Sequence, residues 1–294
     1  MAPATRPSSQ APLEQPRLPA LRLPPGSCDA HCHIFGPFDR YPLPDDRSFT
    51  PPPAPETLLR RLHDRFGFAR AVIVQSQGHG FDHAPLLDAL RGGTERYRGV
   101  ALVRPSDSDA QLAALDAAGV RGARVNFLAH LGGRPAPDAV RTLAARIKPW
   151  GWHLALHVSG SDIVDCAPLI RSLALPIVID HMARPDLAEG PHGPAISTLR
   201  DLMDCGHVWV KLSGADRLSR TGAPFHDALP IARCLAGHAP ERVVWGSDWP
   251  HVNLQAAMPD DGDLVDLITD IVPDAANRRS LLVDNPGELF GFDG

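Results

Sequence analysis

The chain has 294 residues, of which 44% are hydrophobic and 21% charged, with a formal net charge of -5 at pH 7. This composition suits a globular protein with a sizeable core, and the negative balance argues against nucleic acid or an anionic membrane as a partner. The chain contains five cysteines without a regular spacing, and we find no apolar run long enough to span a bilayer. Both features predict free thiols and a cytoplasmic location.

Residues 1–27 are rich in proline and lack an apolar stretch, so we expect a flexible, dispensable tail and no secretory signal. From residue 28 onward, short apolar runs alternate with segments of helical periodicity. The expected strands are 28–33, 71–75, 99–103, 122–126, 153–158, 176–181, 208–212 and 243–247. The expected helices are 58–66, 84–91, 109–118, 138–148, 163–173, 195–204, 227–237, 263–271 and 275–283.

Eight strand–helix repeats predict an α/β fold of the (β/α)₈ TIM-barrel type, formed as a single domain by residues 28–294. An open doubly wound sheet is the alternative. The first expected strand is not followed by a GxGxxG motif, which argues against dinucleotide binding.

Polar residues end most of these strands, and in a barrel such ends meet at one mouth. His31 and His33 are two residues apart on the first strand, so both imidazoles can reach one metal ion. His157, His181 and Asp248 end strands five, six and eight. Three imidazoles and a carboxylate suit zinc or a similar divalent ion, and a polar cluster without metal is the alternative.

Asp248, which follows the last strand, is placed to bind metal and to act as a general base; a loop-capping role is the alternative. Arg124 and Arg217 follow strands four and seven and can hold the carboxylates of an anionic substrate. A structural ion pair, for example of Arg217 with Asp216 or Asp186, is the other interpretation. Asn253 can add a neutral contact.

At these residues the chain resembles amidohydrolase family 2, and within it the 2-pyrone-4,6-dicarboxylate lactonases. The resemblance runs from residue 27 to the end, and it rests on DAHCHIFGP (29–37), VQS (74–76), GARVNF (122–127), IDHMARP (179–185), DRL (216–218), WGSDWPH (245–251) and DNP (284–286). It implies a barrel that hydrolyses a carboxylated lactone. The roles that it implies are Asp248 as base, His31, His33 and His181 around the reacting carbonyl, and Arg124, Arg217 and Asn253 on the carboxylates.

The chain departs from the pyrone lactonases at several positions. Those enzymes have tyrosine at the strand-five position and work without metal, whereas His157 here restores the ligand set of zinc-dependent relatives such as the sulfomuconolactone hydrolases. Ala129 and His130 replace basic residues of the family, and the aromatic hydroxyl expected near Phe49 is missing. These changes predict a muconolactone-like substrate and a bound divalent metal, zinc first and manganese second, with a metal-free mechanism as the alternative.

The sequence therefore predicts a lactonase of aromatic-compound degradation that acts on a small anionic lactone. In the main interpretation His31, His33, His157 and Asp248 bind metal, and Asp248 and His181 are catalytic. Three alternatives remain open at this point: a metal-dependent decarboxylase of a carboxymuconate-type substrate, a lactone isomerase, and a binding protein that has lost catalysis. The sequence also leaves a homo-oligomer open.

Overall fold

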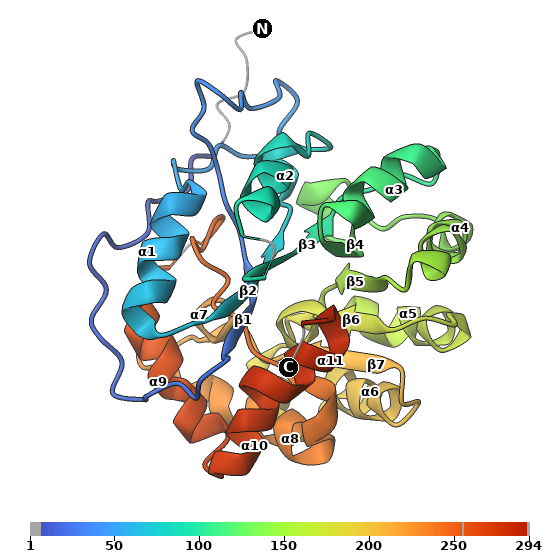
Figure 1. Cartoon of the computed structure of the whole chain (residues 1–294). Coiled ribbons are helices and arrows are strands. Elements are labelled where there is room, and N and C mark those ends of the chain that lie inside the picture. The colour runs from blue at the N-terminus through green and yellow to red at the C-terminus, as the bar shows by residue number, and fades with distance from the viewer. Residues whose placement is uncertain (1–6, 94, 255, 293–294) are drawn as a thin grey trace, which may run out of the picture.

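The structure is a computed structural model that describes residues 7–93, 95–254 and 256–292. Eight parallel strands pair in the order in which they occur in the sequence. The helices lie outside the strands and surround them (Figure 1). The strands are β1 (Cys28–Cys32), β2 (Arg70–Val74), β3 (Tyr97–Ala101), β4 (Val120–Asn126), β5 (His153–His157), β6 (Ile177–Ile179), β7 (Val208–Lys211) and β8 (Val243–Val244).

The chain after β8 meets β1 and closes the barrel. The N–H of Ala30 donates to the carbonyl of Trp245 at 2.9 Å, and the N–H of Asp248 donates to the carbonyl of His31 at 2.8 Å. Gly246 allows this approach, because a Cβ atom at that position would lie 2.5 Å from the backbone nitrogen of His31. The predicted (β/α)₈ barrel is therefore confirmed, in preference to an open doubly wound sheet.

Local signals in the sequence set the helix bounds. Ser108 and Gln111 form a reciprocal capping box at the start of one helix, and Gly67 ends another in the left-handed region, at φ 93°. The helices are α1 (Glu56–Phe66), α2 (Ala84–Arg91), α3 (Asp109–Ala117), α4 (Pro137–Ile147), α5 (Gly160–Ser172), α6 (Pro194–Met203), α7 (Ala215–Leu218), α8 (Leu229–His238), α9 (Asp261–Ile271), α10 (Ala275–Arg279) and α11 (Asn285–Phe290).

The last helical segment differs from the prediction. The single helix expected over 275–283 is instead α10 and a π-helical turn (Ser280–Asp284), and helical structure continues beyond it in α11. The side-chain amide of Asn285 donates to the carbonyls of Pro240 at 2.8 Å and Val243 at 2.7 Å, which draws this part of the chain toward β8. Pro286 has no N–H to donate at the start of α11, so a regular α-helical ladder is interrupted here.

At the end where the strands begin, the barrel interior is apolar apart from His153. Alternate strand residues point inward, and Phe290 and Phe292 pack against them from the C-terminal segment. The outward strand faces pack against the helices in a larger core. Because mainly apolar side chains fill this end, the residues of the polar cavity gather at the opposite end. The inward apolar residues of the strands are Cys28, Ala30, Val72, Val74, Val100, Ala155, Val178, Trp209 and Val244.

The described part of the predicted tail contacts the barrel at several points. The N–H of Ser9 donates to the carbonyl of Thr50 at 3.0 Å, and the N–H of Leu21 donates to Asp266 at 2.8 Å. Residues 1–6 lie outside the described part of the chain. The flexible character of residues 1–27 stays a prediction.

Candidate active site

The residues selected from the sequence gather at the end of the barrel where the strands terminate. A cavity of about 730 Å³ opens there. His31 is fully buried beside this cavity, and the other selected residues line it. The selected residues that line the cavity are His33, Arg124, His157, His181, Arg217, Asp248 and Asn253.

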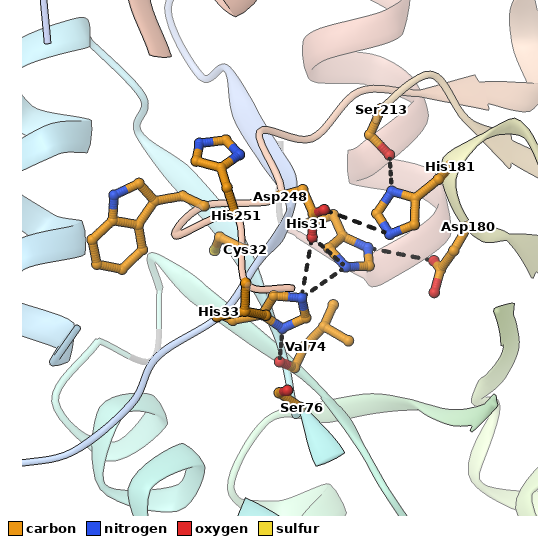
Figure 2. Close-up of polar contacts among 12 residues, drawn as sticks. His31, Cys32, His33, Val74, Ser76, Asp180, His181, Ser213, Asp248 and His251 are labelled. Carbon is orange, nitrogen blue, oxygen red and sulfur yellow. Dashed lines mark hydrogen bonds and ion pairs between the residues drawn. The ribbon is translucent and has the colours of Figure 1, made fainter. Parts of the chain in front are cut away.

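His31, His33 and Asp248 present three donor atoms to one point (Figure 2). The Nε2 atoms of the two histidines are 3.3 Å apart, and Asp248 Oδ1 lies 3.2 Å from that of His33 and 3.6 Å from that of His31. Ligands on a tetrahedral zinc ion stand about 3.3 Å from one another, since each bond is about 2.0 Å long. His33 Nδ1 donates to the carbonyl of Val74 at 2.7 Å, which leaves Nε2 free to bind an ion. The spacing and the donor set therefore fit a divalent metal.

His181 lies next to His31 and Asp248, and His157 lies next to His181. Their ring centroids are 5.4 Å apart, and that of His181 is 4.7 Å from that of His31. His157 Nδ1 donates to Asn126 Oδ1 at 3.2 Å, which leaves its Nε2 without a proton. Within the part of the chain that the structure describes, His157 belongs to none of the groups of three close donor atoms. Its predicted place as a metal ligand therefore stays a prediction.

Burial keeps both of these imidazoles neutral. It lowers the pKa of His181 to about 4, and together with Arg124 it holds the pKa of His157 well below the ordinary value. His181 Nδ1 is 2.9 Å from the hydroxyl of Ser213, and its Nε2 is 3.9 Å from Asp248 Oδ2. A neutral imidazole held in this way can donate a hydrogen bond to a substrate oxygen or accept a proton.

Asp248 is a buried carboxylate that is paired with Arg217. The guanidinium donates through Nε to Asp248 Oδ2, and through Nη1 to the carbonyl of Val252 at 2.9 Å. Burial alone would raise the pKa of Asp248, but Arg217, His181 and His33 outweigh burial and hold this pKa well below the ordinary value. Arg217 thus forms an ion pair, but with Asp248; Asp186 pairs with Arg220 and Asp216 with His251.

A second charged group, which the sequence analysis missed in part, lies behind His31. Lys211 on β7 is fully buried, with Nζ 3.0 Å from His31 Nδ1 and 3.2 Å from Asp180 Oδ1. Arg124 Nε donates to Asp180 Oδ2 at 2.9 Å. Burial alone would raise the pKa of Asp180, but Lys211 and Arg124 hold it well below the ordinary value. The signal for Lys211 was a single cation inside the apolar run VWVK.

The backbone around the cavity is strained. The four residues from His181 to Arg184 all have positive φ values, between 47° and 59°. This left-handed turn brings His181 and Arg184 to the same cavity, although no role was predicted for Arg184. Asp248 and Asn253 also have positive φ values, of 64° and 60°. Non-glycine residues rarely adopt this region, and such strain concentrates at functional sites.

Comparison with known proteins places the chain in a family. Residues 28–292 match the amidohydrolase family. A 2-pyrone-4,6-dicarboxylate hydrolase of Comamonas testosteroni is 40% identical over 284 residues, which cover 94% of this chain and 93% of that protein. The chain belongs to the amidohydrolase family.

Two further relatives of this amidohydrolase have related but different activities. A 4-sulfomuconolactone hydrolase of Hydrogenophaga intermedia is 38% identical, over 92% of this chain and 90% of that protein. A D-galactarolactone isomerase of Agrobacterium fabrum is 32% identical, over 92% of this chain and 93% of that protein. The resemblance predicted from the sequence motifs is thus confirmed at the level of the family and its lactone-hydrolysing members.

Asp29 ties β1 to the loop that carries Asp248. Its Oδ1 accepts hydrogen bonds from the N–H groups of His31 at 3.1 Å and Ser247 at 2.9 Å. Its Oδ2 accepts from the Ser247 hydroxyl at 2.6 Å and from His63 Nε2 of α1 at 3.1 Å. A buried carboxylate that is satisfied in this way fixes the backbone on both sides of it. The sequence marked Asp29 only as the start of a motif.

His251 lies behind Asp248 between two aspartates. Its ring nitrogens are 3.5 Å from Asp216 and 3.1 Å from Asp261. The backbone N–H of His251 donates to the carbonyl of Asp248 at 2.9 Å. Burial alone would lower the pKa of His251, but the two carboxylates outweigh burial and raise it to about 10. Asp216, the first residue of the DRL motif, thus takes part in this buried ion pair.

Among the described residues, no helix is both long and apolar enough to cross a membrane.

Proposed function

We propose that this amidohydrolase opens the lactone ring of a small carboxylated substrate of the muconolactone or pyrone-dicarboxylate type, an intermediate of aromatic-compound degradation. One observation carries the proposal: the carboxylate of Asp248 stands beside three imidazoles in a cavity lined by three arginines. The named activities of the two hydrolase relatives support this reaction type.

In this proposal Asp248 takes a proton from the attacking water. The acidity of Asp248 in the free protein comes mainly from its contact with Arg217. A substrate carboxylate that shares the Arg217 guanidinium would weaken this contact and raise the pKa of Asp248. Substrate binding would thereby make the carboxylate a stronger base at the moment when a base is needed.

His181 is the proposed donor to the carbonyl oxygen of the lactone. Its imidazole is neutral, and Ser213 holds its Nδ1, so Nε2 can carry a proton toward the cavity. A donor fixed in this position stabilises the negative charge that develops on the oxygen during attack. Arg124, Arg217 and Asn253 are the proposed contacts for the carboxylates, and Arg184 adds a cation to the same wall.

We propose further that His31, His33, His157 and Asp248 hold a divalent ion, zinc in the first place and manganese in the second. When bound, such an ion polarises the lactone carbonyl and lowers the pKa of the attacking water. The donor spacing and the tautomer of His33 support His31, His33 and Asp248 as ligands. The contact of His157 Nδ1 with Asn126 supports the fourth, because it leaves Nε2 without a proton. The contact of Lys211 Nζ with His31 Nδ1 supports the metal-free alternative, because it favours a proton on His31 Nε2.

A lactone isomerase is the second candidate, because one relative is named as a D-galactarolactone isomerase. The same arginines could hold a sugar-acid lactone, and Asp248 could activate a substrate hydroxyl in place of water. The two candidates differ in what attacks the carbonyl. They therefore differ in whether the product is an open acid or a second lactone.

The experiment for the proposal is turnover of muconolactone, 4-sulfomuconolactone and 2-pyrone-4,6-dicarboxylate by protein loaded with zinc or manganese. Asp248→Asn should lower kcat by about a thousand-fold or more, because the neutral amide cannot accept the proton. Asp138→Asn is the matched control, since the Asp138 side chain is 97% exposed. The proposal fails if no lactone is opened, or if Asp248→Asn retains the activity of the wild type.

We also propose that the protein acts in the cytoplasm on a free small molecule, as its composition predicts. The formation of a homo-oligomer stays open.

A further inference from the structure

The N-terminal segment of residues 7–10, which we call the N-terminal strap, lies at the candidate active site. All four residues line the same cavity as Asp248 and the arginines. Backbone hydrogen bonds join the strap to the chain that follows β1. The N–H of Ser9 donates to the carbonyl of Thr50, and the N–H of Thr50 donates to the carbonyl of Pro7, both at 3.0 Å.

The strap also contacts the loop that follows β8. The hydroxyl of Ser9 accepts a hydrogen bond from the N–H of Asn253 at 3.0 Å. Asn253 has a positive φ of 60°, and the neighbouring Val252 carbonyl holds the guanidinium of Arg217. Ser9 therefore supports a strained turn whose position affects both Arg217 and its partner Asp248.

A second set of contacts anchors the chain that follows the strap. The N–H of Arg17 lies 3.0 Å and 3.1 Å from the two carboxylate oxygens of Asp260, which caps α9. The guanidinium of Arg17 pairs with Asp266 at 2.7 Å, and the N–H of Leu21 donates to Asp266 at 2.8 Å. Prolines at positions 7, 12, 16 and 19 restrict the unfolded segment, which reduces the entropy lost when it docks.

We propose that the N-terminal strap is a specificity-determining wall of the substrate cavity, and that Ser9 is a positioning residue for the Asn253 turn. This inference rests on the proposed function for the identity of the substrate. The strap adds neutral hydroxyl and amide groups to a cavity that already contains four charged side chains, those of Arg124, Arg184, Arg217 and Asp248. It therefore encloses a carboxylated lactone and adds no further charge that the substrate must match.

Deletion of residues 2–10 tests this proposal against a control deletion of residues 2–6, which keeps the strap. The first deletion should lower kcat/KM for the lactone by about ten-fold or more, because an enclosing wall with its hydrogen bonds is lost. The control deletion should stay within about two-fold of the full chain. Equal kcat/KM in the full chain and the longer deletion would overturn the proposal.

Single substitutions cover the case in which the longer deletion does not fold. Ser9→Ala should raise KM about five-fold and leave kcat within about two-fold, because one hydrogen bond to the Asn253 turn is lost. Ser9→Thr keeps the hydroxyl and should restore the KM of the full chain. A Ser9→Ala variant with unchanged KM, or a Ser9→Thr variant that behaves like Ser9→Ala, would contradict the positioning role.

Two readouts keep this test independent of lactone turnover. Citrate, a tricarboxylate, is the calorimetric probe of the cavity, and the longer deletion or Ser9→Ala should weaken its binding by about five-fold or more. Hydrogen exchange at residues 248–254 should be about five-fold faster in either variant than in the full chain. A full chain without lactonase activity contradicts the proposed function alone. Unchanged exchange in these variants overturns the strap proposal whether or not citrate or a lactone is bound.

Discussion

His153 offers a quantitative test of how the barrel interior treats charge. The residue lies on β5, four positions before His157, and its side chain is buried inside the barrel. The ring packs against Phe290, with centroids 5.2 Å apart, and a Cβ atom at Gly122 would lie only 2.3 Å from it. Burial first, and then the nearby charge of Lys211, lower the pKa of His153 to about 3.

This pKa shift predicts the sign and size of a pH effect. An ordinary histidine in the unfolded chain has a pKa of about 6.5, so the unfolded state binds a proton at pH values where the folded state does not. The contribution of His153 to stability is therefore present above pH 6.5 and is lost as the pH falls toward 3. Between pH 7.5 and pH 5.0 the loss is about 2 kcal/mol for these two pKa values.

The assay is urea denaturation at both pH values, followed by circular dichroism, on the wild type and on His153→Leu. Only the change in stability between the two pH values is compared, so packing differences caused by leucine cancel. The wild type should lose about 2 kcal/mol more than the variant. His226→Leu is the control, because the His226 side chain is 59% exposed, and it should behave like the wild type. Equal losses in the wild type and His153→Leu would refute the reasoning.

Three further predictions concern the site. Ser213→Ala should lower kcat about ten-fold or more with little change in KM, measured by steady-state kinetics, because His181 loses the partner of its Nδ1. His157→Tyr should lower the zinc or manganese content of purified protein, measured by mass spectrometry; an unchanged content would remove His157 from the metal ligands. Ser247→Ala should reduce the unfolding free energy by about 3 kcal/mol, measured by denaturation. The carboxylate of Asp29 then loses one hydrogen bond, and the backbone N–H of Trp249 loses its acceptor. A loss below about 0.5 kcal/mol would show that the Asp29 network is not structural.

The barrel could be predicted because each strand is a compact apolar run followed by a polar residue, and the carboxyl ends of barrel strands face one mouth. The bounds were less accurate where the backbone is irregular. The strand expected over 176–181 ends at Ile179, since Asp180 begins the left-handed turn that carries His181. The strand expected over 243–247 ends at Val244. Beyond it, the carbonyl of Trp245 and the N–H of Asp248 form single hydrogen bonds to β1 and no regular ladder.

The site residues that lie at strand ends could be predicted from the sequence. Those whose roles depend on tertiary contacts were predicted less well. Lys211 is the last residue of β7, but its role follows from the distances to His31 and Asp180, which a sequence does not contain. Arg184 reaches the cavity through four consecutive left-handed residues, a conformation that the residue types do not indicate. The N-terminal strap was missed for a related reason, because its proline-rich composition is typical of a tail and its contacts are with distant residues.

The central claim is that water, activated by Asp248, opens a lactone in this cavity. Turnover of muconolactone in water enriched in oxygen-18, by metal-loaded protein, tests this claim most directly through mass spectrometry of the product. One labelled oxygen should appear in the new carboxylate, and Asp248→Asn should form this product at least about a thousand-fold more slowly. Conversion to a second lactone without label would contradict hydrolysis and assign the site to isomerisation.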